Sequence, residues 1–393
     1  MNRGTGGRDA LTVFGKEIVD ALRDRRTLLV VLLSSVLMGP LVLVALSGLI
    51  ATFESRAEQR EVWLDGLENA PTLVNFFARQ TYTVRAAPAG YEQALRDSTF
   101  ADPVVVVAKD FEAKLAQGDV PVLEVVSDSA NKRSEAGTGR VQRLLQGFNR
   151  ERAVVALALR GVAGELLEPV RVDERDLAST ATRGAQFTGM LPFFVLMAVL
   201  YGALNAALDS TAGERERGSL EPLLMNPVDR VALVLGKWGA VACVGMLIAV
   251  LSCFSFIPAQ WLLRSDTLAA LFQYGVREAL LFLVVLLPFA AALSAVLMAV
   301  AIRCRTFKEA QANATVVVLA VSLLPLFSVF NLGGEARWHL WVPALGQNVL
   351  MNRVLKGEAV GVEAVFVPLA VCVGLAATGI WFVARVLRSA AVK

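Results

Sequence analysis

Six long runs of uncharged, mostly apolar residues constrain this 393-residue chain more than any other feature. A helix needs about 20 such residues to cross the hydrocarbon core of a bilayer, and each run reaches that length. The predicted spans are Thr27 to Phe53, Gly184 to Leu208, Trp238 to Leu263, Ala279 to Ile302, Ala310 to Gly334 and Ala364 to Ala384. With 55% apolar and 19% charged residues, the composition is that of an integral membrane protein. The sequence therefore predicts an α-helical polytopic membrane protein with six transmembrane helices.

Lysine and arginine gather in alternate short loops, which predicts the orientation of the chain. They are frequent in residues 1–26, in the 209–237 loop, between the fourth and fifth spans, and in the tail 385–393. Because cytoplasmic loops carry the excess of Lys and Arg, both termini and the 209–237 loop are expected in the cytoplasm. The first run is too long for a signal-peptide core, so it is interpreted as a retained span.

Residues 54–183, between the first two spans, have the composition of a water-soluble domain of ordinary size. The orientation places this domain outside the cytoplasm, where long loops escape the charge bias. The predicted strands are Val104 to Ala108, Val120 to Val126, Thr81 to Ala86 and Val170 to Val172, and the predicted helices are Phe111 to Gln117 and Arg140 to Arg160. The second helix is expected to face the core with Val141, Leu144, Leu145, Phe148, Val155 and Leu159. The sequence therefore predicts a mixed α/β domain inserted between helices 1 and 2.

The 209–237 loop is expected to be a compact hairpin that contains a short helix. Ser219 is a suitable N-cap, and Asn226-Pro227 would end the helix after about two turns. The candidate contact residues are the charge block Glu214, Arg215, Glu216 and Arg217 and the adjacent Leu220, Glu221, Leu223 and Leu224. A capped helix resting on lipid is one interpretation, and a knob presented to a soluble partner is the other. The alternating charges beside a leucine face favour the partner, because a protein groove can use that alternation.

Leu11 to Arg26 is amphipathic, which predicts a helix in the membrane interface before the first span. Its apolar stripe comprises Leu11, Phe14, Ile18 and Leu22, whereas Lys16, Glu17 and Arg23 lie elsewhere on the helix. A solvated helix packed on a partner is the alternative.

The external stretch 335–363 is expected to dip into the outer leaflet or to lie on it. Trp338 and Trp341 resemble an interfacial belt, Leu345 to Leu355 has helical spacing, and His339 is interpreted as an interfacial residue. Prolines at positions 40, 192, 258, 288 and 325 predict kinks or breaks in the spans. The four cysteines match no metal motif and are expected to serve as small apolar side chains.

Asp, Glu, Lys and Arg are absent from the middle of every predicted span, which argues against an ion-coupled carrier. The polar side chains left as candidates for a translocation path are Gln186, Asn205, Gln311 and Asn313. The sequence also lacks a P-loop, a His-Glu-x-x-His motif and a Gly-x-Ser-x-Gly elbow. We therefore expect no catalytic residue, no metal site and no ATP site on this chain, and the charge pattern indicates no nucleic-acid partner.

Four stretches carry a resemblance to a known family. They are Lys16-Glu17 with Arg23 to Arg26, Glu214 to Leu224, Thr306 to Gln311, and Pro343 to Gln347. Together they resemble the ABC-2 type transporter permeases, in particular the sodium-extrusion (NatB-type) branch. The resemblance covers nearly the whole chain and is most specific in the 209–237 hairpin.

The resemblance implies one half of a type V exporter in a bacterial cell membrane. The permease would pair with itself or with a related permease, and two separate ATP-binding subunits would bind ATP and Mg. The hairpin would be the coupling helix seated on the ATPase, and residues 1–26 would form the elbow helix. Closure of the ATPases would then rock the two permease halves and expose an outward path.

The substrate and two other classes of function stay open at this stage. The branch suggests sodium, whereas an amphiphile such as a drug, lipid or peptide suits an uncharged path equally well. A mechanotransmission or sensory protein would use the same hairpin to move its external domain without transport. An intramembrane enzyme is the third class, and the single histidine and the uncharged spans disfavour it.

Overall fold

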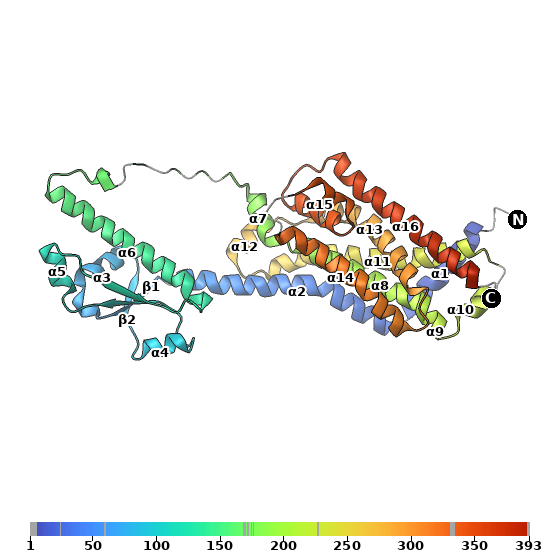
Figure 1. Cartoon of the computed structure of the whole chain (residues 1–393), viewed down its shortest axis with the longest axis horizontal. Coiled ribbons are helices and arrows are strands. Elements are labelled where there is room, and N and C mark those ends of the chain that lie inside the picture. The colour runs from blue at the N-terminus through green and yellow to red at the C-terminus, as the bar shows by residue number, and fades with distance from the viewer. Residues whose placement is uncertain are drawn as a thin grey trace. The chain divides into compact units, whose positions relative to one another are not determined.

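The computed structural model describes residues 6–23, 25–58, 60–167, 170, 173, 175, 177–225, 228–330 and 335–390. The chain divides into two compact units, both shown in Figure 1. The membrane unit comprises Met1–Ala51 and Leu177–Lys393, and the α/β unit comprises Thr52–Asp176.

The α/β unit contains a four-stranded sheet in the order β2-β1-β3-β4. The strands are β1 (Glu61–Asp65), β2 (Thr83–Ala86), β3 (Val104–Val107) and β4 (Leu123–Val126). β1 pairs in parallel with β2 and β3, and β4 runs antiparallel to β3. The helices are α3 (Pro71–Arg79), α4 (Tyr91–Arg96), α5 (Phe111–Gln117) and α6 (Lys132–Leu159), with short 3-10 turns η1 (Leu67–Asn69) and η2 (Gly164–Leu167). The prediction of mixed α and β structure is confirmed, and β1, at the centre of the parallel part, was missed.

The core of the α/β unit is aromatic and aliphatic. Phe77 and Phe111 are buried almost completely, and Phe76 packs edge-on against Phe148 with ring centroids 5.4 Å apart. Two sequence expectations for α6 are wrong, because Val155 and Leu159 are exposed on its last turns. Near the end of this unit, Val170 lies in a bend, and residues 171 and 172 of that predicted strand lie outside the described residues.

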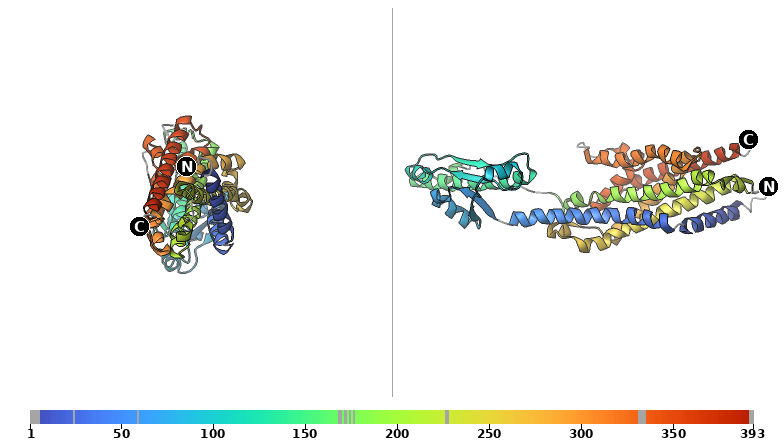
Figure 2. Two further views of the ribbon diagram at one scale, coloured as in Figure 1. Left: turned by 90° about the vertical axis from the view of Figure 1, so that its right-hand side faces the viewer. Right: turned by 90° about the horizontal axis from the view of Figure 1, so that it is seen from below.

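The membrane unit is helical, apart from its connections. It begins with α1 (Gly6–Arg23) and α2 (Arg25–Glu58), whose last residues enter the α/β unit. It continues with α7 (Thr180–Thr188), α8 (Leu191–Leu208), η3 (Asp209–Gly213), α9 (Glu214–Glu216), α10 (Leu220–Met225), α11 (Arg230–Ala259), η4 (Gln260–Leu262), α12 (Asp266–Leu271), α13 (Val276–Ala301), α14 (Phe307–Phe330), η5 (Arg337–Trp341), α15 (Leu345–Leu355) and α16 (Val362–Ala390). Within this unit α1, α9, α10 and the C-terminal end of α16 gather at one end, and α7, α12 and α15 at the other (Figures 1 and 2).

Five helical segments among the described residues are long and apolar enough to cross a membrane. They are Thr182–Glu216, Arg230–Leu262, Val276–Ala301, Phe307–Phe327 and Val362–Ser389. The first predicted span, Thr27 to Phe53, falls within α2, where the structure shows a shorter apolar stretch, Val36–Thr52. A sixth spanning helix therefore stays a prediction, as does the location of the α/β unit.

The predicted kink prolines occupy two kinds of position. Pro40, Pro258, Pro288 and Pro325 lie inside helices. Pro192 instead lies at the start of α8, so the helix begins anew where a missing N–H costs little.

The stretch from η5 to α15 packs into the membrane unit. α15 has the predicted bounds, and most of it is buried within the unit, while its position in or on the outer leaflet stays a prediction. His339 is buried as well, with its ring against Trp338, and its place at the membrane interface stays a prediction.

Candidate functional site: a buried ionic cluster beside the α9–α10 segment

Four charged side chains meet at the end of the membrane unit that carries α9. Lys237, near the start of α11, is only 2% exposed. Its Nζ donates to Glu17 Oε1 at 2.9 Å, to Glu214 Oε2 at 2.6 Å and to the carbonyl oxygen of Ser210 at 3.1 Å. All three ammonium hydrogens therefore have an acceptor, which is the condition under which a lysine can be buried with its charge.

Lys16 closes this ionic cluster, defined here as Lys16, Glu17, Glu214 and Lys237, from the outside. Its Nζ lies 3.1 Å from Glu17 Oε1 and 3.3 Å from Glu214 Oε1. Partial burial lowers the pKa of Lys16, but the carboxylates of Glu17 and Glu214 raise it more, so the net shift is upward. Two cations thus face two buried anions, and the cluster is neutral as a whole.

Glycines on α11 allow α1 to come close enough for these contacts. A Cβ built on Gly236 would lie 2.7 Å from both the carbonyl oxygen of Ala10 and Cβ of Val13, and Gly239 faces the ring of Phe14. Small residues at a helix interface let the backbones approach. Gly236 and Lys237 therefore act together: one admits α1, and the next residue binds it.

The other charged residues of α9 bind a different part of the unit. Arg215 Nη1 donates to the carbonyl oxygen of Cys304 at 3.2 Å, in the turn between α13 and α14. Glu216 Oε2 accepts a 2.6 Å hydrogen bond from the backbone N–H of Phe307, the first residue of α14. A carboxylate at that position satisfies one of the free amides of a helix N-terminus and suits the helix dipole. Arg217 pairs with Asp209 in its own helix at 2.9 Å.

A glycine turn then separates α9 from α10. Gly218 has φ +69°, the left-handed conformation that glycine adopts without strain. The N–H of Gly218 bonds the carbonyl of Arg215, and the N–H of Ser219 bonds that of Glu214, which together form a Schellman motif. The long helix through α8 and η3 ends here, and α10 starts at Leu220 as the sequence predicted.

The structure separates the predicted contact residues into two groups. Glu214 and Leu220 are buried, which contradicts the expectation that both belong to an exposed face. Arg215 is half-buried, whereas Glu216, Arg217 and Glu221 are exposed. Leu223 and Leu224 belong to α10, but their side chains lie outside the described residues. Met225, which is not among the predicted contact residues, is 87% exposed at the end of α10.

The predicted elbow helix is present as α1, with a different inner face. Val13 and Glu17 are its buried residues, Phe14 is half-buried, and Arg23 is exposed in the last turn. Leu11 and Leu22, which belong to the predicted apolar stripe, are exposed. An apolar outer edge on this helix is compatible with contact to lipid.

The four candidate path residues do not meet in one site. Gln186 lies on α7, and Gln311 and Asn313 lie near the start of α14, next to α9. α8 separates these positions by about 27 Å, from 18 residues at 1.5 Å each. Asn205 is engaged with its own helix through the carbonyl of Tyr201, and Asn313 donates to Cys304 Sγ at 3.2 Å. Within the described part of the chain, no group of three His, Cys, Asp or Glu residues is arranged to hold a metal.

Sequence reasoning missed the residue at the centre of the cluster. Lys237 stands at the start of a long apolar run and was assigned to the edge of the hairpin. A cation that is buried beside such a run needs an anionic partner. Glu17, on the predicted amphipathic helix, is an anion that this rule could have pointed to. The partners of Arg215 and Glu216 are backbone atoms about 90 residues away, and no side-chain pattern marks them.

Comparison with known proteins agrees with this architecture. The ABC-2 family transporter protein family matches residues 11–382, which include most of α1, the α/β unit, the ionic cluster and most of α16. The chain is 25% identical over 358 residues to the protein named ABC transporter permease protein NatB of Bacillus subtilis (strain 168), covering 88% of this chain and 89% of that one. No solved structure matches the chain. The chain belongs to the ABC-2 family of transporter proteins, as a permease, which is the membrane component and not the ATPase.

Proposed function

We propose that this permease subunit moves its substrate out of the cytoplasm, driven by a separate ATP-binding subunit that docks on α9 and α10. In this proposal both termini and the α9–α10 segment are cytoplasmic, and the α/β unit lies outside. The family implies an ATP-binding partner. Two copies of that partner, and a pair of permeases, form the complete transporter.

The observation that carries the coupling proposal is the distribution of contacts from α9. Glu214 binds Lys237 of α11 and Lys16 of α1, while Arg215 and Glu216 hold the start of α14. Three helices are thereby connected to a segment of three residues. A displacement of α9 reaches α1 and α11 through ionic contacts of the buried Glu214, which resist separation, and it reaches α14 through two hydrogen bonds to backbone atoms.

The docking surface is the exposed part of this segment. Glu216, Arg217, Glu221 and Met225 offer alternating charge beside an apolar side chain at the end of α10. Such a surface suits a protein groove with complementary charge, where the charges set the partner and the apolar group supplies burial. The buried members of the segment, Glu214 and Leu220, hold it in place from behind.

Docking is tested by co-purification of the permease with a co-expressed ABC ATP-binding subunit. We expect Glu221→Lys combined with Met225→Asp to reduce the bound ATPase about tenfold or more, while the permease still inserts into the membrane. Val120→Asp is the matched control, since Val120 is 89% exposed in the α/β unit. Wild-type co-purification and wild-type turnover by the double variant would place the interface elsewhere.

Transport itself is tested in vesicles that contain the permease and its ATPase. Outward transport predicts ATP-dependent movement of a radioactive sodium ion or of an amphiphilic dye, and the two substrates are assayed separately. Hydrolysis that responds to the permease without flux of either would favour the mechanotransmission alternative. That alternative has in its favour an α/β unit with its own core.

A further inference from the structure

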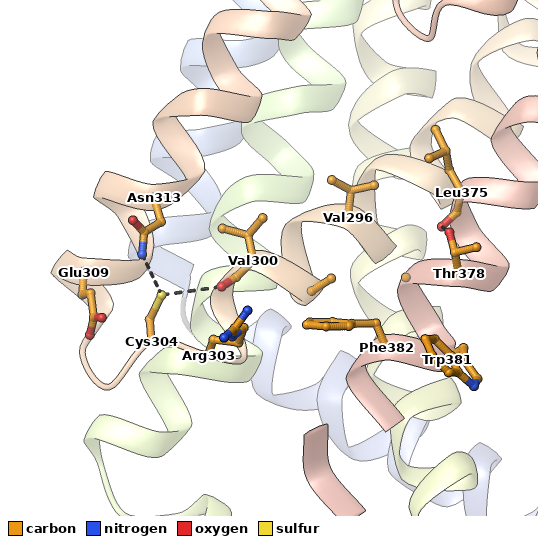
Figure 3. Close-up of a pocket in the computed structure, with 12 residues that line it drawn as sticks. Val296, Val300, Arg303, Cys304, Glu309, Asn313, Leu375, Thr378, Trp381 and Phe382 are labelled. Carbon is orange, nitrogen blue, oxygen red and sulfur yellow. Dashed lines mark hydrogen bonds between the residues drawn. The ribbon is translucent and has the colours of Figure 1, made fainter. Parts of the chain in front are cut away.

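A cavity of about 820 Å³ lies between α13, α14 and α16 of the membrane unit. Its volume is in the range of small-molecule sites. In Figure 3, Val296, Val300, Leu375, Trp381 and Phe382 are the labelled apolar lining residues, Thr378 lies beside Leu375, and the polar side chains of Arg303, Glu309 and Asn313 come from the end of α13 and the start of α14. The cavity shares only Asn313 with the predicted path residues.

The polar part of this cavity has one cation that is available to a ligand. Arg303, just beyond the end of α13, is exposed, and no ion pair or hydrogen bond of its side chain occurs within the described residues. Glu309, the anion of the lining, accepts from the backbone N–H of Arg305 at 2.8 Å, and within the described residues it forms no ion pair with Arg303. Asn313 is engaged by Cys304 Sγ, as Figure 3 shows.

Further basic residues lie on the elements that line the cavity. Arg385 lies over the ring of Trp381, a lining residue, with 5.3 Å from its guanidinium carbon to the ring centroid. Arg305, Lys308 and Arg388 are exposed on the adjoining turn and helix end. An apolar slot with a cationic mouth between spanning helices has the chemistry that binds anionic lipid headgroups.

We propose that this cavity is a binding site for an anionic phospholipid. One acyl chain lies along Val296, Val300, Leu375 and Phe382, and the phosphate pairs with Arg303. A guanidinium binds phosphate through two parallel N–H donors, which makes Arg303 the specific contact and the surrounding cations a general attraction.

The position of Arg303 gives the site a consequence for the rest of the unit. It neighbours Cys304, whose carbonyl oxygen holds Arg215, and the same turn leads into Phe307, which is bound by Glu216. A lipid phosphate on this turn therefore lies one residue from the contacts of α9. The binding step itself does not depend on the proposed transport function.

The test is lipid binding to the purified full chain, measured by native mass spectrometry in detergent. Dioleoyl phosphatidylglycerol is compared with two controls. Dioleoyl phosphatidylcholine has the same acyl chains without the net negative charge, and glycerol phosphate has the negative charge without the acyl chains. We expect retention of phosphatidylglycerol alone, and an affinity about tenfold lower for Arg303→Gln. Arg303→Lys should recover part of the loss, because it keeps the charge and gives up the bidentate geometry.

Two further variants separate a built site from general surface charge. Arg305→Gln removes an exposed arginine from the same turn that does not line the cavity, and it should leave the affinity within about twofold. Val300→Trp fills the apolar part and should lower the affinity as much as Arg303→Gln. Equal losses for Arg303→Gln and Arg305→Gln, equal retention of phosphatidylcholine, or full retention by Val300→Trp would each overturn the proposal. Wild-type protein that binds glycerol phosphate as well as the lipid, or binds no lipid, would do the same.

Discussion

The ionic cluster of the membrane unit and the aromatic core of the α/β unit are both buried, but they hold their surroundings together by opposite means. In the cluster, Lys237 has one acceptor for each hydrogen, and the contacts are directional. In the α/β unit, Phe77 and its neighbours are held by apolar burial, which has no preferred direction. A directional site fixes the register of α1 against α11, whereas an apolar core only requires that its volume be filled. This difference suits the first region to transmit a displacement.

The largest expected effect follows from removing the central cation. Lys237→Met leaves Glu17 and Glu214 buried with Lys16 alone, and breaking a buried ion pair costs about 3–5 kcal/mol. We expect a large fall in the thermal midpoint of the purified permease and in the yield of monodisperse protein. Size-exclusion chromatography after graded heating measures both.

Removing the two anions as well shows whether the stability lost in Lys237→Met is caused by uncompensated charge or by the change in side-chain volume. Lys237→Met combined with Glu17→Gln and Glu214→Gln should recover much of the lost stability, because no uncompensated charge is left in the interior. A triple variant less stable than Lys237→Met would show that the cluster does not behave as a charge-balanced unit.

The aromatic core should respond to volume and not to charge. Phe77→Ala is expected to cost about 3 kcal/mol through lost burial and the cavity left behind, and Phe77→Leu less than half of that. Hydrogen exchange on the full chain should rise in α3, β1 and β3 and stay unchanged in α11, since the two units have separate cores. Faster exchange in α11 would contradict that independence.

The sequence predicts the locally patterned, apolar elements well and the contacts between distant charged residues poorly. Apolar periodicity located α5, α10 and α15 and three of the four strands, because those patterns are local. It missed β1, whose Trp63 and Leu64 carry no long β-branched run, and it extended the inner face of α6 too far, to Leu159. It also gave Glu214 to an exposed face, because the buried partner of Glu214 is 23 residues further along the chain and looked like the edge of a loop. Pairings between distant charged residues depend on how helices pack, which periodicity does not encode.

The smallest expected effect concerns Lys16, the member of the cluster that water reaches. Its side chain is 47% exposed, so solvent screens its pairs and Lys16→Gln should cost less than about 1 kcal/mol. The pKa of Lys16 is raised in the folded protein above its ordinary value of 10.5. Its contribution is therefore complete below that value and is lost only as the pH rises through the raised one, so the cost of Lys16→Gln should stay constant from pH 6 to 9.

In 1 M salt, where the Debye length falls to about 3 Å, the difference between wild type and Lys16→Gln should shrink, while the cost of Lys237→Met persists because salt does not enter a buried pair. Thermal midpoints of both variants at low and high salt measure this, and a Lys16→Gln protein as unstable as Lys237→Met would remove the distinction between the outer and the central cation.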